Sequence, residues 1–258
     1  MSRIGNAFTQ NKAFIGFVTG GDPSIEKSEN YIMRMIEAGA DLIEIGIPFS
    51  DPIAEGPVIR RANARALVAG ATTDKLFTLV MHLRHKTNVP IVFLTYLNPV
   101  FRYGYDAYFK KCQKTGVDGI IIPDLPFEEQ DEVCDFTSKY GVEIISLVSP
   151  TSENRIEAIA RSAKGFVYIV SSMGVTGVRD KITTDLASMV TRIKRIKDIP
   201  AAVGFGISTS TQAADIAKVA DGVIVGSAIV NLIEQYGEYA ENQIFEYVKG
   251  MKETIMSV

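Results

Sequence analysis

"LIEIGIPFSDPIAEGP", residues 42 to 57, begins as a buried strand and ends as a loop rich in proline and glycine. Its first six residues are almost all apolar, which is typical of a strand that is covered on both faces, as in parallel sheets. The strand carries one acid, Glu44, and the loop carries Asp51 and Glu55. The stretch therefore combines a parallel-sheet strand with carboxyl side chains in and beyond it.

Seven further apolar runs alternate with segments of helical periodicity. They cover residues 14–20, 91–97, 119–124, 144–149, 166–172, 200–206 and 222–228. Helices between them have recognisable ends, with Ser24 and Thr73 as N-caps and Gly39 and Gly116 as the glycines that follow helix C-termini. Eight strand-and-helix units in 258 residues are the number and length of a (β/α)8 barrel.

We therefore predict an α/β fold, a TIM barrel with additional short helices, as a single domain over residues 1–258. A doubly wound open sheet with extra strands is the alternative. The hydrophobic content of 47% is enough for a sizeable core. No linker or low-complexity stretch divides the chain.

Composition excludes several classes of function. The 27 basic and 30 acidic residues leave no positive excess for binding nucleic acid. No apolar run approaches the roughly 20 residues that span a bilayer, and the N-terminus has no apolar segment, so we expect a soluble cytoplasmic protein without membrane contact. The two cysteines, Cys112 and Cys134, fall on helical segments, which favours reduced thiols over a disulfide.

Glu44 is the first candidate catalytic residue. Strand side chains alternate, so if Ile43 and Ile45 pack against helices, Glu44 points into the barrel. An unpaired carboxylate there has a raised pKa, as a general acid or base requires. The alternative is a buried ion pair, but none of the eight runs contains Lys or Arg.

A second group of candidates lies late in the chain. "GFG" (204–206) ends the seventh run, and "GSA" (226–228) leads into a helix. Glycine backbones and helix N-termini offer N–H donors to anions, and phosphate sites in barrels are commonly built there. The alternative is that Gly204 and Gly206 only relieve crowding at a turn.

Absences narrow the chemistry further. The runs contain no Lys for a Schiff base, no dinucleotide fingerprint or P-loop occurs, and His82 and His85 have no partner at metal-ligand spacing, so we predict no metal site. Asp124 ends the fourth run and either caps the helix that begins near Phe127 or takes part in chemistry. Cofactor-free carboxylate acid–base chemistry on a phosphorylated small molecule remains.

The sequence resembles the tryptophan synthase alpha chain family over essentially its whole length. The most specific motif is "GIPFSDP" (46–52), and the likeness also rests on "FIGFVTGGDP", "YLNPVFRYG", "IIIPDLPFEE", "SSMGVTGVR", "GFGIS" and "VIVGSAIV". The resemblance implies the retro-aldol cleavage of indole-3-glycerol phosphate to indole and D-glyceraldehyde 3-phosphate.

The resemblance also implies roles for residues. Glu44 would act as acid and then base, Glu55 would accept the indole N–H, and Thr176 would belong to a lid in the loop after the sixth run. The phosphate contacts would fall on Gly177, Gly206, Gly226 and Ser227. The indole pocket would fall on Phe17, Leu94, Tyr96, Ile121, Pro123, Leu147 and Tyr168.

A partner is implied in the same way. The alpha chain docks on a pyridoxal-phosphate beta chain in an alpha2beta2 heterotetramer, so this chain itself would carry no cofactor. Pro48, Phe49, Ser50 and Asp51 match the segment nearest that interface; the alternative is a rigid connector with a capping Asp.

Glu55 departs from the family pattern, which has Asp in "ADGP" where this chain has "AEGP". A displacement of about 1 Å can lower the rate on the order of a hundredfold. Two alternatives therefore stay open, a stand-alone indole-3-glycerol-phosphate lyase and a weakly catalytic allosteric activator of the beta chain. A sugar-phosphate isomerase of the same fold is more remote, because "GIPFSDP" argues against it.

Overall fold

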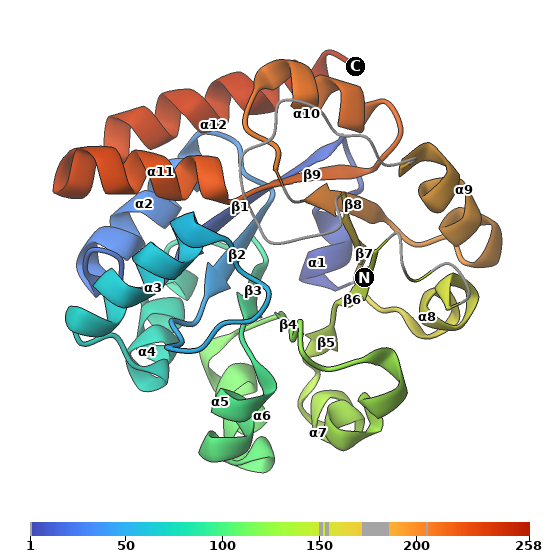
Figure 1. The fold of residues 1–258 in the computed structure, drawn as a ribbon, viewed down its shortest axis with the longest axis horizontal. Helices are drawn as coiled ribbons and strands as arrows, with labels where there is room; N and C mark the ends of the chain where they lie inside the picture. The colour runs from blue at the N-terminus through green and yellow to red at the C-terminus, as the bar shows by residue number, and fades with distance from the viewer. Residues whose placement is uncertain (1, 150–151, 153–154, 172–185, 205) are drawn as a thin grey trace.

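All strands of the sheet run parallel. The computed structural model describes residues 2–149, 152, 155–171, 186–204 and 206–258. The strands are β1 (Ala13–Thr19), β2 (Leu42–Gly46), β3 (Ile91–Leu94), β4 (Gly119–Ile121), β5 (Glu143–Ile144), β6 (Ser146–Val148), β7 (Val167–Val170), β8 (Ala201–Gly204) and β9 (Gly222–Val225). Their order is β5-β4-β3-β2-β1-β9-β8-β7-β6, and Figure 1 shows them at the centre of a ring of helices.

One of the eight predicted runs supplies both edges of this sheet. β5 pairs with β4 and β6 pairs with β7, and only Ile145 separates β5 from β6. The backbone N–H of Ile145 still donates to Ile120 over 2.9 Å, so the run changes neighbours within a few residues. The sheet is therefore a nearly closed barrel, and the TIM-barrel prediction is confirmed, with the fifth run divided into two strands.

The helices follow the strands along the chain. They are α1 (Arg3–Asn6), α2 (Ile25–Glu37), α3 (Pro57–Val68), α4 (Thr73–Arg84), α5 (Leu97–Tyr103), α6 (Tyr105–Thr115), α7 (Asp131–Tyr140), α8 (Ile156–Ser162), α9 (Leu186–Ile196), α10 (Ser210–Ala217), α11 (Ser227–Tyr236) and α12 (Glu241–Met256), with 3-10 turns η1 (Phe127–Glu129) and η3 (Gly237–Tyr239). Cys112 lies on α6 and Cys134 on α7, both as free thiols.

Three of the four predicted helix ends are confirmed. The Ser24 side chain accepts from the first turn of α2, and Gly39 and Gly116 follow α2 and α6 with positive φ angles. The N-cap of α4 is Thr72 instead of Thr73, because Thr72 is extended and its hydroxyl reaches a backbone N–H of the first turn. The prediction at Thr73 was wrong by one residue.

Side-chain alternation divides the core into two layers. Ile43 and Ile45 belong to the outer layer between strands and helices, whereas Leu42 belongs to the inner layer. Every one of the eight runs contributes to the inner layer, which contains Ile15, Leu42, Val92, Ile121, Ile145, Phe166, Tyr168, Ala202 and Ile224, with two residues from the sixth run. Ile4 of α1 is fully buried in this layer, and Figure 1 shows α1 inside the ring.

The described residues add two findings on excluded classes. No helix among them is long and apolar enough to cross a membrane. His82 on α4 is exposed, with its Nδ1 atom 3.7 Å from a carboxylate oxygen of Glu29. Within the described part of the chain, no three His, Cys, Asp or Glu side chains are grouped as metal ligands.

Candidate active site

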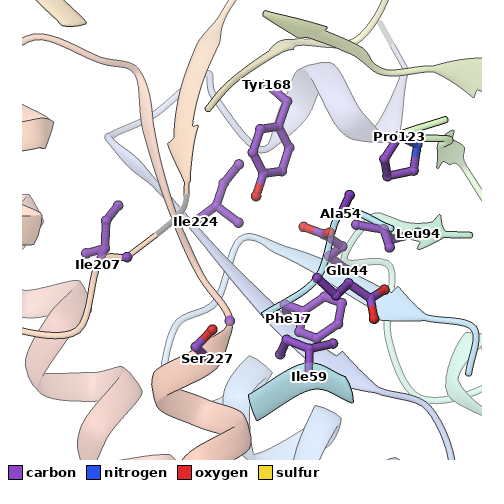
Figure 2. Close-up of a pocket in the computed structure, with 13 residues that line it drawn as sticks. Phe17, Glu44, Ala54, Ile59, Leu94, Pro123, Tyr168, Ile207, Ile224 and Ser227 are labelled. Carbon is purple, nitrogen blue, oxygen red and sulfur yellow. The ribbon is translucent and has the colours of Figure 1, made fainter. Parts of the chain in front are cut away.

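A cavity opens at the carboxyl ends of the barrel strands. Its void is about 590 Å³ measured out to the open mouth, and Figure 2 shows its side chains. It is lined by Phe17, Glu44, Ala54, Glu55, Ile59, Leu94, Pro123, Tyr168, Gly206, Ile207, Ile224, Gly226 and Ser227. Most of these side chains are apolar, so the cavity suits a flat apolar ligand with polar groups at two places.

Glu44 points into this cavity from β2. It is 1% exposed, and its neighbours in register are Phe17 on β1 and Val92 on β3. Burial raises the pKa of Glu44 to about 8, and the charge of Glu55 adds to the effect. Among the described residues its Oε2 atom has no hydrogen-bond partner. The carboxyl group is therefore protonated near neutral pH and free to give up that proton.

Glu55 reaches the cavity from the loop between β2 and α3. The side-chain amide of Asn63 donates to its Oε2 atom over 2.6 Å, and the hydroxyl of Tyr96 donates to the same carboxylate. Burial raises the pKa of Glu55 to about 7, although the hydrogen bonds from Asn63 and Tyr96 and the charge of Arg60 oppose it. More of Glu55 than of Glu44 is therefore ionised at neutral pH.

The two carboxyl groups can divide acid and base functions between them. The pKa of Glu55, about 7, is lower than that of Glu44, about 8, because Glu55 accepts hydrogen bonds that favour its charged form. One protonated acid and one carboxylate then share an apolar cavity near pH 7.5, which is an arrangement used for proton transfer.

The opposite side of the cavity presents backbone donors. Gly226 and Ser227 lie at the N-terminus of α11, which has no side-chain cap. Gly206 has φ +86, a conformation that favours glycine. Uncapped N–H groups and the helix dipole make such an end an anion site. Figure 2 shows Ser227 and Ile207 across the cavity from Glu44.

Comparison with known proteins identifies the family. The family model for the tryptophan synthase alpha chain matches residues 6–256. The chain belongs to the tryptophan synthase alpha chain family. A Lacticaseibacillus casei tryptophan synthase alpha chain is 48% identical over 252 residues, 98% of this chain and 95% of the relative. Tryptophan synthase alpha chains are lyases that cleave indole-3-glycerol phosphate to indole and glyceraldehyde 3-phosphate, and this chain is an enzyme of that class.

Solved structures of tryptophan synthases agree with the fold. The Mycobacterium tuberculosis enzyme superposes with TM-score 0.90 at 34% identity, covering 99% of this chain and 98% of that one. A chain from the alpha2beta2 tryptophan synthase complex of Pyrococcus furiosus superposes with TM-score 0.88 at 35% identity, covering 94% of this chain and 98% of that one. The likeness to tryptophan synthase alpha chains therefore extends over nearly the whole length of this chain, both in sequence and in fold.

The cavity collects most of the predicted site residues of this alpha chain. Glu44, Glu55, Gly206, Gly226 and Ser227 line it. Of the predicted indole pocket, the lining includes Phe17, Leu94, Pro123 and Tyr168. Thr176 and Gly177 lie outside the described residues.

Three residues of the predicted indole pocket lie elsewhere. The hydroxyl of Tyr96 accepts a hydrogen bond from the backbone N–H of Ala54 over 3.1 Å, so Tyr96 anchors the loop between β2 and α3 (residues 47–56), the second loop of the alpha chain. Ile121 belongs to the inner layer of the core, and Leu147 packs at its edge. None of these three side chains lines the cavity as the structure describes it.

Gly204 and Asp124 have structural contacts. A side chain at Gly204 would come within 2.4 Å of the Tyr168 hydroxyl, so this glycine makes room for a ring that lines the cavity. Asp124 accepts from the backbone N–H of Leu97 over 2.9 Å. It therefore supports the start of α5, and of the two roles left open for Asp124 the cap near Phe127 is excluded, because η1 has no side-chain cap.

The predicted partner segment lies in the second loop, beside the cavity. Asp51 is exposed and accepts a hydrogen bond from the hydroxyl of Ser50. Pro48 is half-buried, and the ring of Phe49 packs on that of Tyr96 with 5.4 Å between centroids. The segment is thus packed against Tyr96 on one side and open to solvent on the other.

Sequence reasoning missed part of the cavity lining and one contact. The unpredicted lining residues are Ala54, Ile59, Ile207 and Ile224. Ile224 could have been found, because it has the inward parity of its strand. Ile59 lies one helical turn before Asn63 on α3, but the contact between Asn63 and Glu55 depends on the conformation of a loop, and no periodic pattern reports it.

Proposed function

We propose that Glu44 and Glu55 together carry out the cleavage of indole-3-glycerol phosphate in this alpha chain. The observation that supports this assignment is the position of Glu44, a buried and protonated carboxyl group across an apolar cavity from an uncapped helix N-terminus. The indole ring would lie between Phe17, Leu94 and Tyr168, and the phosphate would bind at Gly226 and Ser227, together with Gly206 and Gly177.

The reaction needs two proton transfers at one side chain. Glu44 gives its proton to carbon C3 of the indole ring, which places positive charge on the ring nitrogen. The bond from C3 to the glycerol carbon then breaks as the hydroxyl on that carbon loses its proton to the Glu44 carboxylate and becomes the aldehyde carbonyl. Indole keeps the first proton, glyceraldehyde 3-phosphate leaves, and Glu44 returns to its starting state.

Glu55 stabilises the charge that this sequence creates. Its carboxylate would accept the hydrogen bond of the indole N–H, which strengthens when the nitrogen becomes positive. A group that binds the transition state better than the substrate raises the rate. Glu55 would do this with a side chain one methylene longer than the Asp of the family pattern.

We further propose a beta chain as partner in an alpha2beta2 heterotetramer, with Pro48 and Asp51 near the interface and pyridoxal phosphate only in the beta chain. Ile53 and Phe101, which are 71% and 62% exposed, supply apolar surface for such contact. Enzymes of amino-acid biosynthesis work in the cytoplasm, and we propose the same location for this chain.

Steady-state indole release, with and without a beta chain, tests the proposal. We expect Glu44→Gln to be nearly inactive, because it has no proton to give, and Glu55→Gln to be impaired about a hundredfold or more. Glu253→Gln is the matched control, since Glu253 is exposed on α12. Wild-type turnover in Glu44→Gln would exclude the mechanism.

The beta-chain arm of the assay separates the alternatives. Indole release that a beta chain leaves unchanged would indicate a stand-alone lyase. A chain that releases no indole but raises beta-chain turnover would be an activator. Faster turnover in Glu55→Asp than in the native chain would mean that the longer side chain is a handicap.

A further inference from the structure

Asn63 is a buried polar residue without a role in the mechanism above. It is 3% exposed and lies on α3, eight residues after Glu55. Its side-chain amide donates to Oε2 of Glu55 over 2.6 Å. Because Gly56 is the N-cap of α3, Asn63 lies almost two helical turns into the helix, and the side chains of Glu55 and Asn63 together bridge that distance.

Tyr96 holds the same carboxylate from the other side. Its ring is 2% exposed, and its hydroxyl accepts from the backbone N–H of Ala54 over 3.1 Å. With that bond made, the hydroxyl proton is directed at the carboxylate of Glu55. Two donors from two different elements, α3 and the turn after β3, therefore converge on Glu55.

We infer that Asn63 is a positioning residue for the reaction: with Tyr96, it holds the Glu55 carboxylate in one place and in its charged form. This inference rests on the proposed role of Glu55 at the indole nitrogen. Hydrogen bonds donated to a carboxylate favour its ionised state. They also leave the remaining lone pairs of the carboxylate for a ligand in the cavity.

The groups that face Glu55 act in opposite directions. Glu44 on β2 shares the cavity and repels a second negative charge, and burial disfavours any charge there. Arg60 on α3 contributes a favourable charge, but its side chain is exposed and screened. The two short-range donors, Asn63 and Tyr96, are therefore the buried groups that offset the cost of ionising Glu55.

The contact requires a side chain of the length of Glu at position 55. Removing one methylene withdraws the carboxylate by about 1.5 Å. The 2.6 Å contact with Asn63 would then open to roughly 4 Å, beyond a hydrogen bond. The length of Glu55 and the amide of Asn63 thus form one matched pair, which a paired substitution can test.

The pH dependence of kcat/KM for indole release tests the inference in the intact chain with a beta chain present. We expect Asn63→Ala to lower kcat/KM about tenfold at pH 7 and to move the acidic limb upward by about one pH unit. The alkaline limb, set by Glu44, should move less, because burial rather than the charge of Glu55 is the larger cause of the raised Glu44 pKa. KM should change less than kcat, because Asn63 does not line the cavity.

Two further variants guard against a purely structural effect. Asn63→Asp keeps the shape but places a second carboxyl group against Glu55, and it should move the acidic limb further than Asn63→Ala. Thr137→Val is the matched control, since Thr137 is also 3% exposed, and its hydroxyl donates within α7 to the carbonyl of Cys134. The control should leave both limbs where they are.

A length exchange gives the sharpest test. Glu55→Asp with Asn63→Gln moves one methylene from the acid to the amide and lets the two side chains meet again. We expect this double variant to have at least about tenfold higher kcat than the product of the two single effects predicts. Multiplicative effects, or an acidic limb that does not move in Asn63→Ala and Asn63→Asp, would overturn the inference.

The outcomes keep this inference separate from the proposed function. A native chain that releases no indole at any pH contradicts the proposed function itself. A native chain that releases indole, together with Asn63 variants that keep its pH profile, contradicts only the role of Asn63. Thermal unfolding of each variant identifies any loss that comes from misfolding.

Discussion

Arg65 donates two hydrogen bonds to the carboxylate of Asp22, over 2.9 and 2.8 Å, and a third to Glu234 over 2.9 Å. Asp22 follows β1, and its side chain is completely buried. Arg65 lies on α3, which carries Asn63, and Glu234 lies on α11, whose N-terminus lines the cavity. One guanidinium group therefore joins the elements that hold the two ends of the candidate active site.

Arg65→Met should unfold more easily, because it leaves Asp22 buried without its partner. We expect the free energy of unfolding to fall by about 3 kcal/mol at pH 8. This value lies at the lower end for a broken buried ion pair, because Arg65 itself is 32% exposed. Burial already raises the pKa of Asp22 despite the guanidinium. The pKa rises further without Arg65, so the loss should shrink as the pH falls and Asp22 takes up a proton.

Arg61→Met is the matched control for this measurement. Arg61 lies one turn before Arg65 on α3 and binds Glu234 through two nitrogens, over 2.7 Å each. Its side chain is 53% exposed, and no buried acid depends on it. Urea unfolding at pH 8 and pH 5 should show little change in Arg61→Met at either pH. Equal losses in the two variants would contradict the role of buried Asp22.

Glu44→Gln should be more stable than the native chain while it loses activity. The pKa of Glu44 rises from its ordinary value of 4.5 to about 8 on folding. The folded state therefore binds this proton more tightly than the unfolded state, and the stability that the proton contributes is lost as the pH rises toward 8. A neutral side chain of the same shape has no such loss.

The stability difference between Glu44→Gln and the native chain should thus depend on pH. It should be near zero at pH 4.5, grow between that pH and pH 8, and level off above it at about 2–4 kcal/mol. Glu253→Gln, at an exposed position, should track the native chain. A difference that is constant from pH 5 to pH 9 would mean that Glu44 is ionised in the folded protein.

The alternation of side chains along strands made much of the barrel predictable, together with the inward direction of the Glu44 side chain. Alternation along residues 42–46 separates Ile43 and Ile45 from Leu42 and Glu44, and the structure places these pairs in the outer and inner layers. The same parity holds for Ile224. Burial of a strand on both faces is a local property, so the sequence of each strand reports it.

Contacts between elements were less predictable. The change of neighbours at Ile145 depends on how the barrel closes, and no residue in that run is unusual for a strand. Asp124 supports α5 rather than η1, because the end of β4 lies beside the end of β3. Tyr96 and Asn63 meet Glu55 only through the path of the second loop. Each of these contacts is set by tertiary geometry, which a single sequence does not encode as a pattern.

The two cysteines should differ in reactivity toward a thiol reagent. Cys112 is fully buried on α6, and burial raises the pKa of its thiol well above the usual range. Cys134 on α7 is only partly buried, with a smaller rise of its pKa. At pH 8 a disulfide reagent should modify Cys134 at least about a hundredfold faster, and Cys112 at the rate of global unfolding. Mass spectrometry of the quenched reaction assigns the site, and equal rates would contradict the packing of α6.

Ser227→Asp should weaken substrate binding without weakening the fold. Ser227 is the first residue of α11 and lines the cavity, and a carboxylate in a first helical turn normally stabilises the helix. A like charge at about 4 Å from a phosphate costs roughly 4 kcal/mol at an effective dielectric constant of 20. Solvent at the open mouth of the cavity screens part of this repulsion, so KM should rise about a hundredfold, and inhibition by inorganic phosphate should weaken in parallel.

Ser210→Asp separates the anion site from a general effect of charge. Ser210 is also the first residue of a barrel helix, α10, but it is exposed and does not line the cavity. Its substitution adds the same charge to a helix end that Thr209 caps and that lies outside the cavity, so KM should stay within about twofold of the native value. Thermal unfolding should show both variants at least as stable as the native chain. If KM is unchanged in Ser227→Asp, or rises equally in the two variants, the substrate phosphate does not bind at the N-terminus of α11.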